Sequence, residues 1–401
     1  MANVSSSNGL EKYPKLRFPE FDEPYRKCRI GDIYAERGQR GAGDMELLSV
    51  TMNDGVMPRS EIEGKDNSSE DKSNYKVVCK DDMVYNSMRM WQGANGVSNY
   101  DGIVSPAYTV LMPIEEIDNR YFAALFKTSN LINEFRKNSQ GLTSDTWNLK
   151  YPQIRPIRLY IPSLREQHKI SAFIDALEER IGKQRQLVDA LKKYKRGAIR
   201  QILSPKSCPL KNAKWTTTRM SELGSFVKGA SLSKADISEE GTPFILYGEL
   251  YTTYNEVITK IKRRTQAKVD ELYLSCVGDV VIPTSGETPE EISTASCVML
   301  PGVILAGDLN IFRSNKVDGR IISYLLNHVV NAKIARIAQG KSVVHIQASE
   351  LGKLTLSYPD ENTQKTIIDF LSKLDEKIIS EENALTFLTD LKEGLMQQLF
   401  I

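Results

Sequence analysis

Residues 163–203, SLREQHKISAFIDALEERIGKQRQLVDALKKYKRGAIRQIL, carry the strongest structural signal in the chain. The stretch follows Pro162, and Ser163 and Glu166 have the spacing of a capping box, which marks the start of a helix. Apolar residues then recur at alternating intervals of four and three for more than four heptads, which is typical of a coiled coil. We expect the seam of this helix to contain Ile170, Ile174, Leu177, Ile181, Val188 and Leu191.

The same pattern occurs again 197 residues later, where residues 354–400 align with residues 157–203 at twelve identical positions. The second seam contains Ile367, Leu371, Leu374, Ile378, Leu385 and Leu388. The similarity extends upstream, because residues 82–85 match residues 279–282 and a helix-like stretch follows both Asp118 and Asp318. The chain is therefore predicted to be two copies of one unit, each a globular part followed by a long helix.

The two long helices are predicted to pair with each other in the antiparallel sense. Residues 163–203 contain 10 basic and 5 acidic side chains, whereas residues 360–400 contain 4 and 9. Polar residues interrupt the two seams at matching positions, and such residues usually fix the register. These residues are Gln184 and Glu381, and Lys195 and Lys392. Such a pair would make a spacer about 60 Å long. The alternative is a pair of helices that merely dimerise the protein.

The globular parts are expected to mix helices and strands, so the predicted fold class is α+β with an internal pseudo-two-fold repeat. Short β-branched and aromatic runs alternate with turn residues, and an amphipathic helix follows an Asp in each copy. The expected segments are a first globular domain (1–156), a first spacer helix (157–206), a second globular domain (207–353) and a second spacer helix (354–401).

Composition is that of an ordinary globular protein. The 401 residues are 41% hydrophobic and 26% charged with a net charge of +2, so composition alone does not indicate a nucleic-acid binder. No apolar run could span a bilayer, and residues 1–9 lack the apolar core of a signal peptide, so we expect a cytoplasmic protein. The five cysteines lack metal-site spacing and are expected to be reduced thiols.

Four further stretches carry a resemblance to a known family. They are Pro14-Lys-Leu-Arg-Phe-Pro19, Tyr85-Asn-Ser-Met-Arg-Met-Trp-Gln-Gly93, Ile161-Pro-Ser-Leu-Arg-Glu-Gln167 and Leu391-Lys-Glu-Gly-Leu-Met-Gln-Gln-Leu-Phe400. With the order of domain, helix, domain and helix, they make the chain resemble the specificity (S) subunit of type I restriction-modification systems. The second copy departs from the first at Tyr358-Pro-Asp-Glu-Asn-Thr-Gln364. The faces by which the two helices would bind partner subunits are therefore not expected to be identical.

The resemblance implies a division of labour. Each globular part would be a target-recognition domain that reads one half of a bipartite sequence in double-stranded DNA. The helices would set the unread gap and dock two modification subunits, which methylate adenine with S-adenosylmethionine. Restriction subunits, which use ATP and Mg and cut DNA, would join that core. The chain itself would be non-catalytic, with no cofactor and no metal.

DNA binding needs cations for phosphates and polar side chains for base edges, and loops after strands are natural carriers of both. In the first domain, residues 86–92 follow a strand-like run and offer Asn86, Arg89 and Gln92. The alternative is a packed loop in which Met88, Met90 and Trp91 belong to the core. Further candidates are the basic turn with Arg37 and Arg40, and the turn with Thr143 and Ser144.

The matching loop of the second domain offers the hydroxyls of Thr284 and Ser285 but no cation. A basic cluster nearby could hold phosphates, although a solvated charged face is the alternative. The cluster candidates are Lys262, Arg263 and Arg264. The turn after the predicted helical region adds Lys341, Ser342 and His345, and a lone histidine is more often structural than functional.

No catalytic motif is evident. The three histidines, His168, His328 and His345, fall in no metal or triad motif. The stretch Gln339-Gly-Lys-Ser342 resembles the end of a P-loop, but Ala335 stands where the first glycine is required. Two other hypotheses stay open: a DNA methyltransferase or nuclease that acts alone, and a coiled-coil scaffold that binds only proteins.

Overall fold

The computed structural model describes residues 2–3, 13–41, 44–52, 55–66, 68–338 and 344–401. The chain divides into two compact units, unit 1 (residues 1–185 and 383–401) and unit 2 (residues 186–382). Each unit contains a globular part and one segment from each of two long helices, α5 (Leu164–Ile202) and α11 (Glu361–Leu399). Both long helices are thus continuous across the division between the units.

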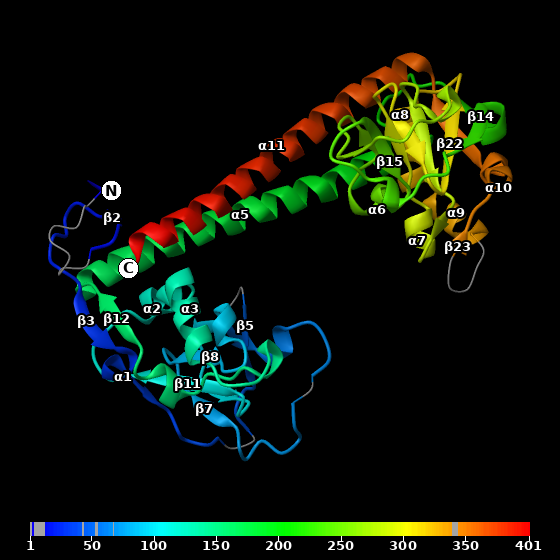
Figure 1. The fold of residues 1–401 in the computed structure, drawn as a ribbon. Coiled ribbons are helices and arrows are strands. Elements are labelled where there is room, and N and C mark those ends of the chain that lie inside the picture. Colours follow the sequence, from blue (N-terminus) through cyan, green and yellow to red (C-terminus); the bar gives the residue numbers. More distant parts are fainter. Residues whose placement is uncertain (1, 4–12, 42–43, 53–54, 67, 339–343) are drawn as a thin grey trace. The chain divides into compact units, whose positions relative to one another are not determined.

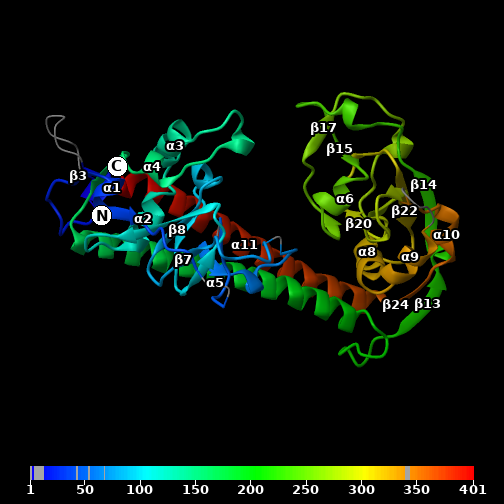
Figure 2. The ribbon, with the colours of Figure 1, turned by 90° about the horizontal axis from the view of Figure 1, so that it is seen from below.

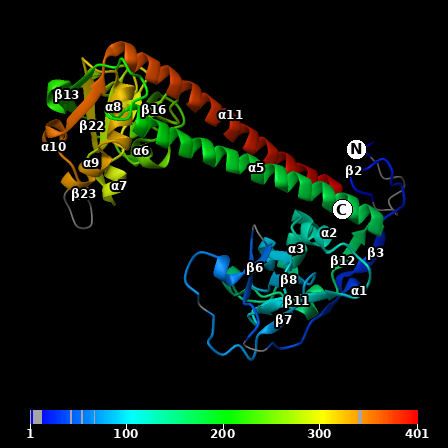
Figure 3. The same cartoon turned by 180° about the vertical axis from the view of Figure 1, so that it is seen from behind.

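The predicted helix seams are buried, and the helices pair in the antiparallel sense within each unit. In unit 1, Ile170 and Ile174 near the start of α5 share a core with Leu399 near the end of α11. In unit 2 the end of α5 packs against the start of α11, because Ile199 of α5 shares a core with Ile367 and Leu371 of α11. Figures 1 and 3 show the two helices side by side in each unit. The other predicted seam residues are buried (Ile181, Val188, Ile378) or partly buried (Leu177, Leu191, Leu374, Leu385, Leu388).

The first turn of α5 is tied to the amino-terminal segment by a buried ion pair. The Glu166 carboxylate accepts two hydrogen bonds from Arg17, at 2.9 Å from Nε and 2.7 Å from Nη2, and both side chains are almost fully buried. The Tyr25 hydroxyl donates a third bond to this carboxylate at 3.2 Å. Glu166, which the capping-box spacing assigned to the helix start, therefore binds a residue 149 positions away in the sequence.

Unit 1 is organised around a four-stranded antiparallel sheet with the strand order β4-β11-β8-β9. Its strands are β4 (Tyr34–Glu36), β11 (Tyr108–Pro113), β8 (Met83–Asn86) and β9 (Asn95–Val97). Two-stranded sheets pair β3 (Arg26–Arg29) with β12 (Arg158–Ile161), β7 (Lys76–Val78) with β10 (Gly102–Val104), β5 (Leu48–Thr51) with β6 (Gly55–Pro58), and β1 (Ala2–Asn3) with β2 (Leu16–Arg17). Strand β8 is buried on both faces, because Met83 and Tyr85 enter one core and Val84 another.

Short helices cover one face of this sheet. They are α1 (Ile30–Ile33), α2 (Asn119–Leu125), α3 (Ser129–Asn138) and α4 (Tyr151–Ile154). Helix α2 begins as the sequence predicts, because the Asp118 carboxylate accepts a hydrogen bond from the Arg120 amide at 2.9 Å. Edge-to-face aromatic contacts join Phe122 to Tyr34, and Phe126 to Phe135.

Unit 2 contains a five-stranded sheet with the order β14-β22-β18-β20-β16 and a three-stranded sheet with the order β17-β15-β21. The first comprises β14 (Gly224–Lys228), β22 (Leu309–Ser314), β18 (Asp279–Pro283), β20 (Ser296–Val298) and β16 (Val257–Ile258). The second, seen in Figure 2, comprises β17 (Arg263–Thr265), β15 (Thr242–Leu246) and β21 (Ile304–Ala306). Two-stranded sheets pair β13 (Trp215–Arg219) with β24 (Thr355–Pro359), and β19 (Ser285–Gly286) with β23 (Val344–His345).

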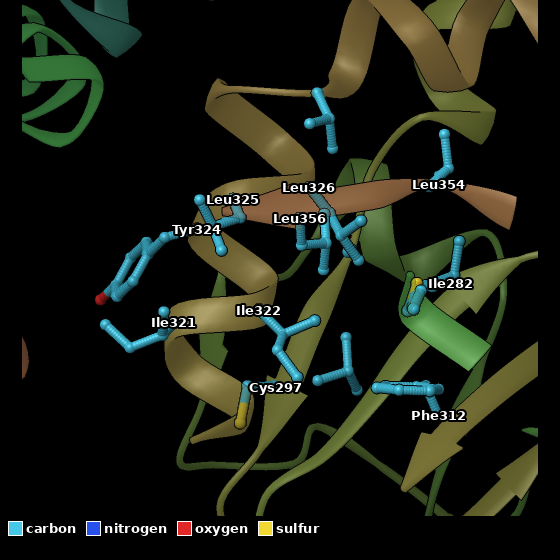
Figure 4. Close-up of a cluster of buried hydrophobic side chains, with 14 of the residues drawn as sticks. Ile282, Cys297, Phe312, Ile321, Ile322, Tyr324, Leu325, Leu326, Leu354 and Leu356 are labelled. Carbon is cyan, nitrogen blue, oxygen red and sulfur yellow. The ribbon is translucent and has the colours of Figure 1, made fainter. Parts of the chain in front are cut away.

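The helices of unit 2 are α6 (Glu249–Thr252), α7 (Pro289–Ile292), α8 (Gly319–His328), α9 (Asn331–Ile337) and α10 (Ala348–Lys353). Helix α8 packs its apolar face on the five-stranded sheet, where Ile322 and Leu326 meet Phe312 and Leu356 in one buried cluster (Figure 4). Tyr324, on the same helix, points away from the centre of this cluster (Figure 4).

The internal repeat is confirmed down to individual hydrogen bonds. Gln167 and Gln364 each accept a bond from the backbone N–H of an Asp, Asp118 and Asp318, at 3.0 Å. Both glutamine side chains also donate to the carbonyl of the proline five residues earlier. These paired contacts show that the two units build the junction between globular part and long helix in the same way.

Among the described residues no helix is long and apolar enough to cross a membrane. All five cysteines are free thiols. Burial raises the pKa of the Cys28 thiol to about 11, so this side chain behaves as part of the core.

Candidate DNA interface

In unit 1 the fold brings together two loops that the sequence singled out separately. The loop after β8 contains a 3₁₀ turn (Met90–Gln92), and the Ser87 carbonyl accepts a 2.8 Å bond from the Leu149 amide. The Trp91 and Trp147 rings meet edge to face with centroids 5.2 Å apart, and the Arg136 guanidinium lies 5.4 Å from the Trp91 ring. Residues 86–92 and 140–149 therefore form one surface, which we call the unit 1 loop pair.

The unit 1 loop pair exposes three of the predicted DNA-contacting side chains at its first loop. Arg89 and Gln92 are exposed, and Asn86 is partly exposed with its Oδ1 accepting a bond from the Met88 amide at 3.0 Å. The packed-loop alternative holds for Met90, which is fully buried, but not for Met88, which is 40% exposed. The first loop thus has an anchor in the core and a polar outer surface.

The second loop of the pair contributes hydroxyl groups. Thr143 and Ser144 are both exposed, next to a 3₁₀ turn (Ser144–Thr146). The Thr143 amide donates to the Thr146 hydroxyl at 3.1 Å, which fixes the turn and leaves Ser144 at its surface.

The two arginines of the Gly-rich basic turn have partners inside the protein. Arg37 donates two hydrogen bonds, at 2.6 and 2.9 Å, to the carboxylate of Asp82, which is 3% exposed. Hydrogen bonding to this carboxylate raises the pKa of Arg37. Arg40 is exposed and donates a 2.6 Å bond to the Asn74 carbonyl. Arg37 uses two of its five donors on Asp82 and Arg40 uses one on Asn74, so Arg40 has more donors left for a phosphate.

Unit 2 repeats the arrangement. The Thr284 carbonyl, directly after β18, accepts a 2.9 Å bond from the Ile346 amide. Both residues lie 197 positions after their unit 1 counterparts, Ser87 and Leu149. Strands β19 and β23 then pair Ser285 with His345. We call residues 284–286 and 344–347 the unit 2 loop pair.

An open pocket of about 740 Å³ adjoins the unit 2 loop pair. Polar side chains from four parts of the sequence line it, among them Lys228, Thr284, Asn310, His345, Gln347 and Ser349. His345 and Gln347 are exposed, whereas Ser285 is buried and its hydroxyl donates to Asp308 at 2.7 Å. The pocket offers donors and acceptors in the mixture that base edges in a DNA groove require.

The basic cluster of unit 2 lies on and beside strand β17. Lys262, Arg263 and Arg264 are all exposed. Arg263 donates to the Glu249 carboxylate at 2.8 Å, and Arg264 donates to the Gly241 carbonyl at 2.8 Å. Lys341 and Ser342 lie outside the described residues. As contacts with DNA, the candidate residues of both units stay predictions.

Sequence comparison identifies the protein class. A family model described as type I restriction modification DNA specificity domain matches residues 27–193 and again residues 212–388. These two matches cover most of the chain. The chain belongs to the type I restriction-modification DNA specificity family. Members of this family recognise DNA sequence, and the two matches fall on the two copies of the internal repeat.

Solved structures agree with this specificity fold. A chain from a study of complex assembly and conformational transition of the type I R-M system has a TM-score of 0.60 and 15% identity, and the match covers 94% of this chain and 97% of that one. The type I restriction-modification S subunit from M. genitalium has a TM-score of 0.57 and 14% identity, with 97% and 99% covered. No curated protein matches the sequence. At such low identity the structural matches establish the fold of the specificity subunit alone.

Some residues at the two loop pairs of this specificity chain gave no signal in the sequence. Asn310 and Ser349 reach the unit 2 pocket from β22 and α10, and Arg136 reaches the unit 1 loop pair from α3. Gln347 lies only two residues after His345, so its proximity in the sequence could have indicated it. Within the described residues no group of three His, Cys, Asp or Glu side chains could hold a metal ion.

Proposed function

We propose that this chain is the DNA-recognition subunit of a type I restriction-modification complex and that it binds a bipartite target. Each loop pair would enter one half-site and contact base edges, while exposed cations around it bind phosphates. Unit 1 would use Arg89, Gln92 and Asn86. Unit 2 would use Thr284, His345 and Gln347, with Lys341 and Ser342 as further candidates.

The observation that carries this proposal is the repetition of one loop-pair geometry in both units. The bonds from Leu149 to Ser87 and from Ile346 to Thr284 join equivalent backbone atoms, yet the exposed side chains around them differ. The unit 1 loop pair has a surface of aromatic and arginine side chains. The unit 2 loop pair adjoins a pocket lined by hydroxyl, amide and imidazole groups. Two domains that recognise different DNA sequences can share a scaffold but need different polar groups at its surface.

The long helices would set the unread gap and dock two modification subunits. Their outer faces support this, because large apolar side chains are exposed there. On the segments in unit 2 these are Leu187 (42% exposed), Tyr194 (58%) and Ile379 (55%), and on the α11 segment in unit 1 they are Phe387 (65%) and Leu391 (39%). Exposed apolar side chains on helices are suited to packing against helices of a partner.

The chemistry would belong to the partners. We propose that the modification subunits supply S-adenosylmethionine-dependent adenine methylation, and that restriction subunits, where present, supply ATP- and Mg-dependent cleavage. The chain would then act as a non-catalytic reader and assembly platform.

DNA binding by the reconstituted complex tests this function. The full-length chain would be purified with its modification subunits, and its affinity for a DNA duplex that carries the target would be measured at several salt concentrations. We expect sequence-specific binding whose affinity falls steeply with salt, by about 0.9 log units per log unit of salt for each phosphate contact. Absence of specific binding would favour the protein-only scaffold, and methylation or cutting by the chain alone would favour the enzyme.

A further inference from the structure

Unit 2 contains a buried polar cluster where its globular part meets the long helices. Lys195 on α5 is 7% exposed, and its Nζ lies 2.8 Å from Oε2 of Glu256 and 2.6 Å from Oδ1 of Asp375 on α11. The other Glu256 oxygen lies 2.6 Å from Nε2 of His328 on α8. The pKa of Glu256 is lowered to about 2, because the bonds from His328 and Lys195 outweigh its burial. Lys195 thus has two carboxylate partners.

Glu256 belongs to an irregular segment of unit 2 that contacts this lysine and leads into a strand. Residue Val257 begins strand β16, which pairs in parallel with β20 at the end of the five-stranded sheet. The Glu256 carbonyl accepts a bond from the Cys297 amide at 2.8 Å, so the segment is held by backbone as well as side-chain bonds. Tyr324 and His328 of α8 also line this place.

The equivalent place in unit 1 lacks these groups. Lys392 and Glu178, each 197 positions from Lys195 and Asp375, form the matching ion pair at 2.6 Å. Helices α2 and α8 begin after Asp118 and Asp318, so small residues, Ala124 and Thr128, stand where unit 2 has Tyr324 and His328. Among the described residues no strand follows β9 at the end of the unit 1 sheet as β16 follows β20.

At this place unit 1 has an open pocket of about 930 Å³, lined by Lys392, Glu178, Ala124 and Thr128, whereas the pocket at the equivalent place of unit 2 is smaller, about 580 Å³. The Lys392 side chain is 31% exposed and, within the described part of the chain, Glu178 is its one carboxylate partner. A second feature of the pocket lacks a partner. Asn95 lines it and is fully buried; its Nδ2 donates to the Gly93 carbonyl at 3.1 Å, and its Oδ1 has no hydrogen-bond partner among the residues that the structure describes.

We propose that the unit 1 pocket binds an extended, carboxylate-bearing segment of a partner protein, in the place that residues 255–257 occupy in unit 2. The partner's carboxylate pairs with Lys392 as Glu256 pairs with Lys195. The proposal rests on the assembly part of the proposed function, since a modification subunit is the partner that would carry such a segment.

The surroundings favour a polypeptide over DNA. Besides the cations Arg120, Lys127 and Lys392, five carboxylates line the pocket, those of Asp81, Asp118, Asp175, Glu178 and Glu393. They would repel a phosphate backbone, whereas a segment with a single carboxylate and free backbone donors suits a mixed lining. The occupant is therefore a protein segment with one acidic side chain.

A peptide copied from the chain itself provides the probe. A fluorescent peptide TTYNEVITK, the sequence of residues 252–260, would be titrated into the full-length chain, with the same peptide carrying Gln in place of Glu as its control. We expect saturable binding that weakens about tenfold or more with the Gln peptide and with Lys392→Met, because a charge-assisted pair is lost. Lys365→Met, which removes an exposed lysine of α11 in unit 2, should leave binding unchanged.

A second variant tests the pocket without touching a charge. Ala124→Tyr combined with Thr128→His gives unit 1 the side chains of unit 2 and should abolish binding. A circular-dichroism spectrum would show that the variant is folded. No binding of the peptide, or equal binding by all variants, would overturn the proposal.

The same variants separate this proposal from the DNA-reading function. Adding the modification subunits should protect the amides of β9 from hydrogen exchange in the wild-type chain but not in Lys392→Met. Lack of protection in the wild type would also contradict the proposal. Specific DNA binding by the complex, measured in parallel, reports on the proposed function independently.

Discussion

Arg37 and Arg89 illustrate what a sequence can and cannot say about a single side chain. Both are arginines in polar turns, and both were expected at a DNA surface. Arg89 is exposed, but Arg37 binds Asp82 across 45 residues of sequence. The arginine stands in a Gly-rich turn while its partner opens a strand, and only the packing of β4 and β8 onto β11 brings them together. Long-range pairing of this kind leaves no local pattern in the sequence.

Replacement of Arg89 tests the unit 1 loop pair. Arg89→Ala should weaken binding of the target by about tenfold, because one good base contact contributes about 1–3 kcal/mol. The variant should lose discrimination at one half-site only. Competition with duplexes altered in one half-site or the other would measure this. Lys27→Ala, which removes an exposed cation from β3 of the same unit, is the matched control. If both variants weakened binding equally for all DNA sequences, Arg89 would act by nonspecific attraction to phosphates and not by contact with a base.

The acid dependence of unit 2 should depend on Glu256. Its pKa falls from an ordinary value of 4.5 to about 2 in the folded protein, so its contribution to stability is complete above pH 4.5 and is lost as the pH falls toward 2. Burial raises the pKa of Asp375, but this residue is common to wild type and variant. We therefore expect the wild type to be more stable than Glu256→Gln at pH 7, and the difference in unfolding free energy to shrink between pH 5 and pH 3. A difference that stays constant over this range would contradict the assignment.

At the scale of elements, the seam of the long helices was largely predictable. Alternation by four and three identified residues such as Ile170, Ile174, Ile367 and Leu371, and all four are buried. Matching polar interruptions also predicted special positions at Lys195 and Lys392. What the pattern could not provide is their partners, since Glu256 reaches Lys195 from an irregular segment 61 residues away. Strand order could not be predicted from the sequence either, because it depends on contacts between strands far apart in the sequence.

The end of α11 is an integral part of unit 1. Phe400 is 5% exposed, and its ring centroid lies 5.2 Å from that of Tyr121. Phe400→Ala should lower the unfolding free energy of unit 1 by about 3–5 kcal/mol, as removal of a buried phenylalanine usually does. Phe387→Ala, within α11, removes a side chain that is 65% exposed and should lower the unfolding free energy far less, as measured by chemical denaturation. A similar loss in both variants would mean that the packing of the α11 end has little influence on stability.

At the scale of the whole molecule, the proposed spacer role makes a quantitative prediction. Inserting seven residues beside Gln184 in α5 and seven beside Glu381 in α11 keeps both heptad seams in phase. Seven residues lengthen a helix by about 10 Å, which corresponds to about three base pairs. We expect the unread gap of the target to grow by that amount while both half-sites stay the same, as shown by the methylated sequence. A change of the half-sites themselves would contradict the division of labour between loop pairs and helices.

The central claim is that this chain selects a two-part DNA sequence for modification by its partners. Single-molecule methylation sequencing of the host genome, with the gene intact and then deleted, tests it most directly. The account predicts that methyladenine at one bipartite motif with a fixed gap disappears on deletion and returns on complementation. An unchanged methylome, with the gene shown to be expressed, would contradict it.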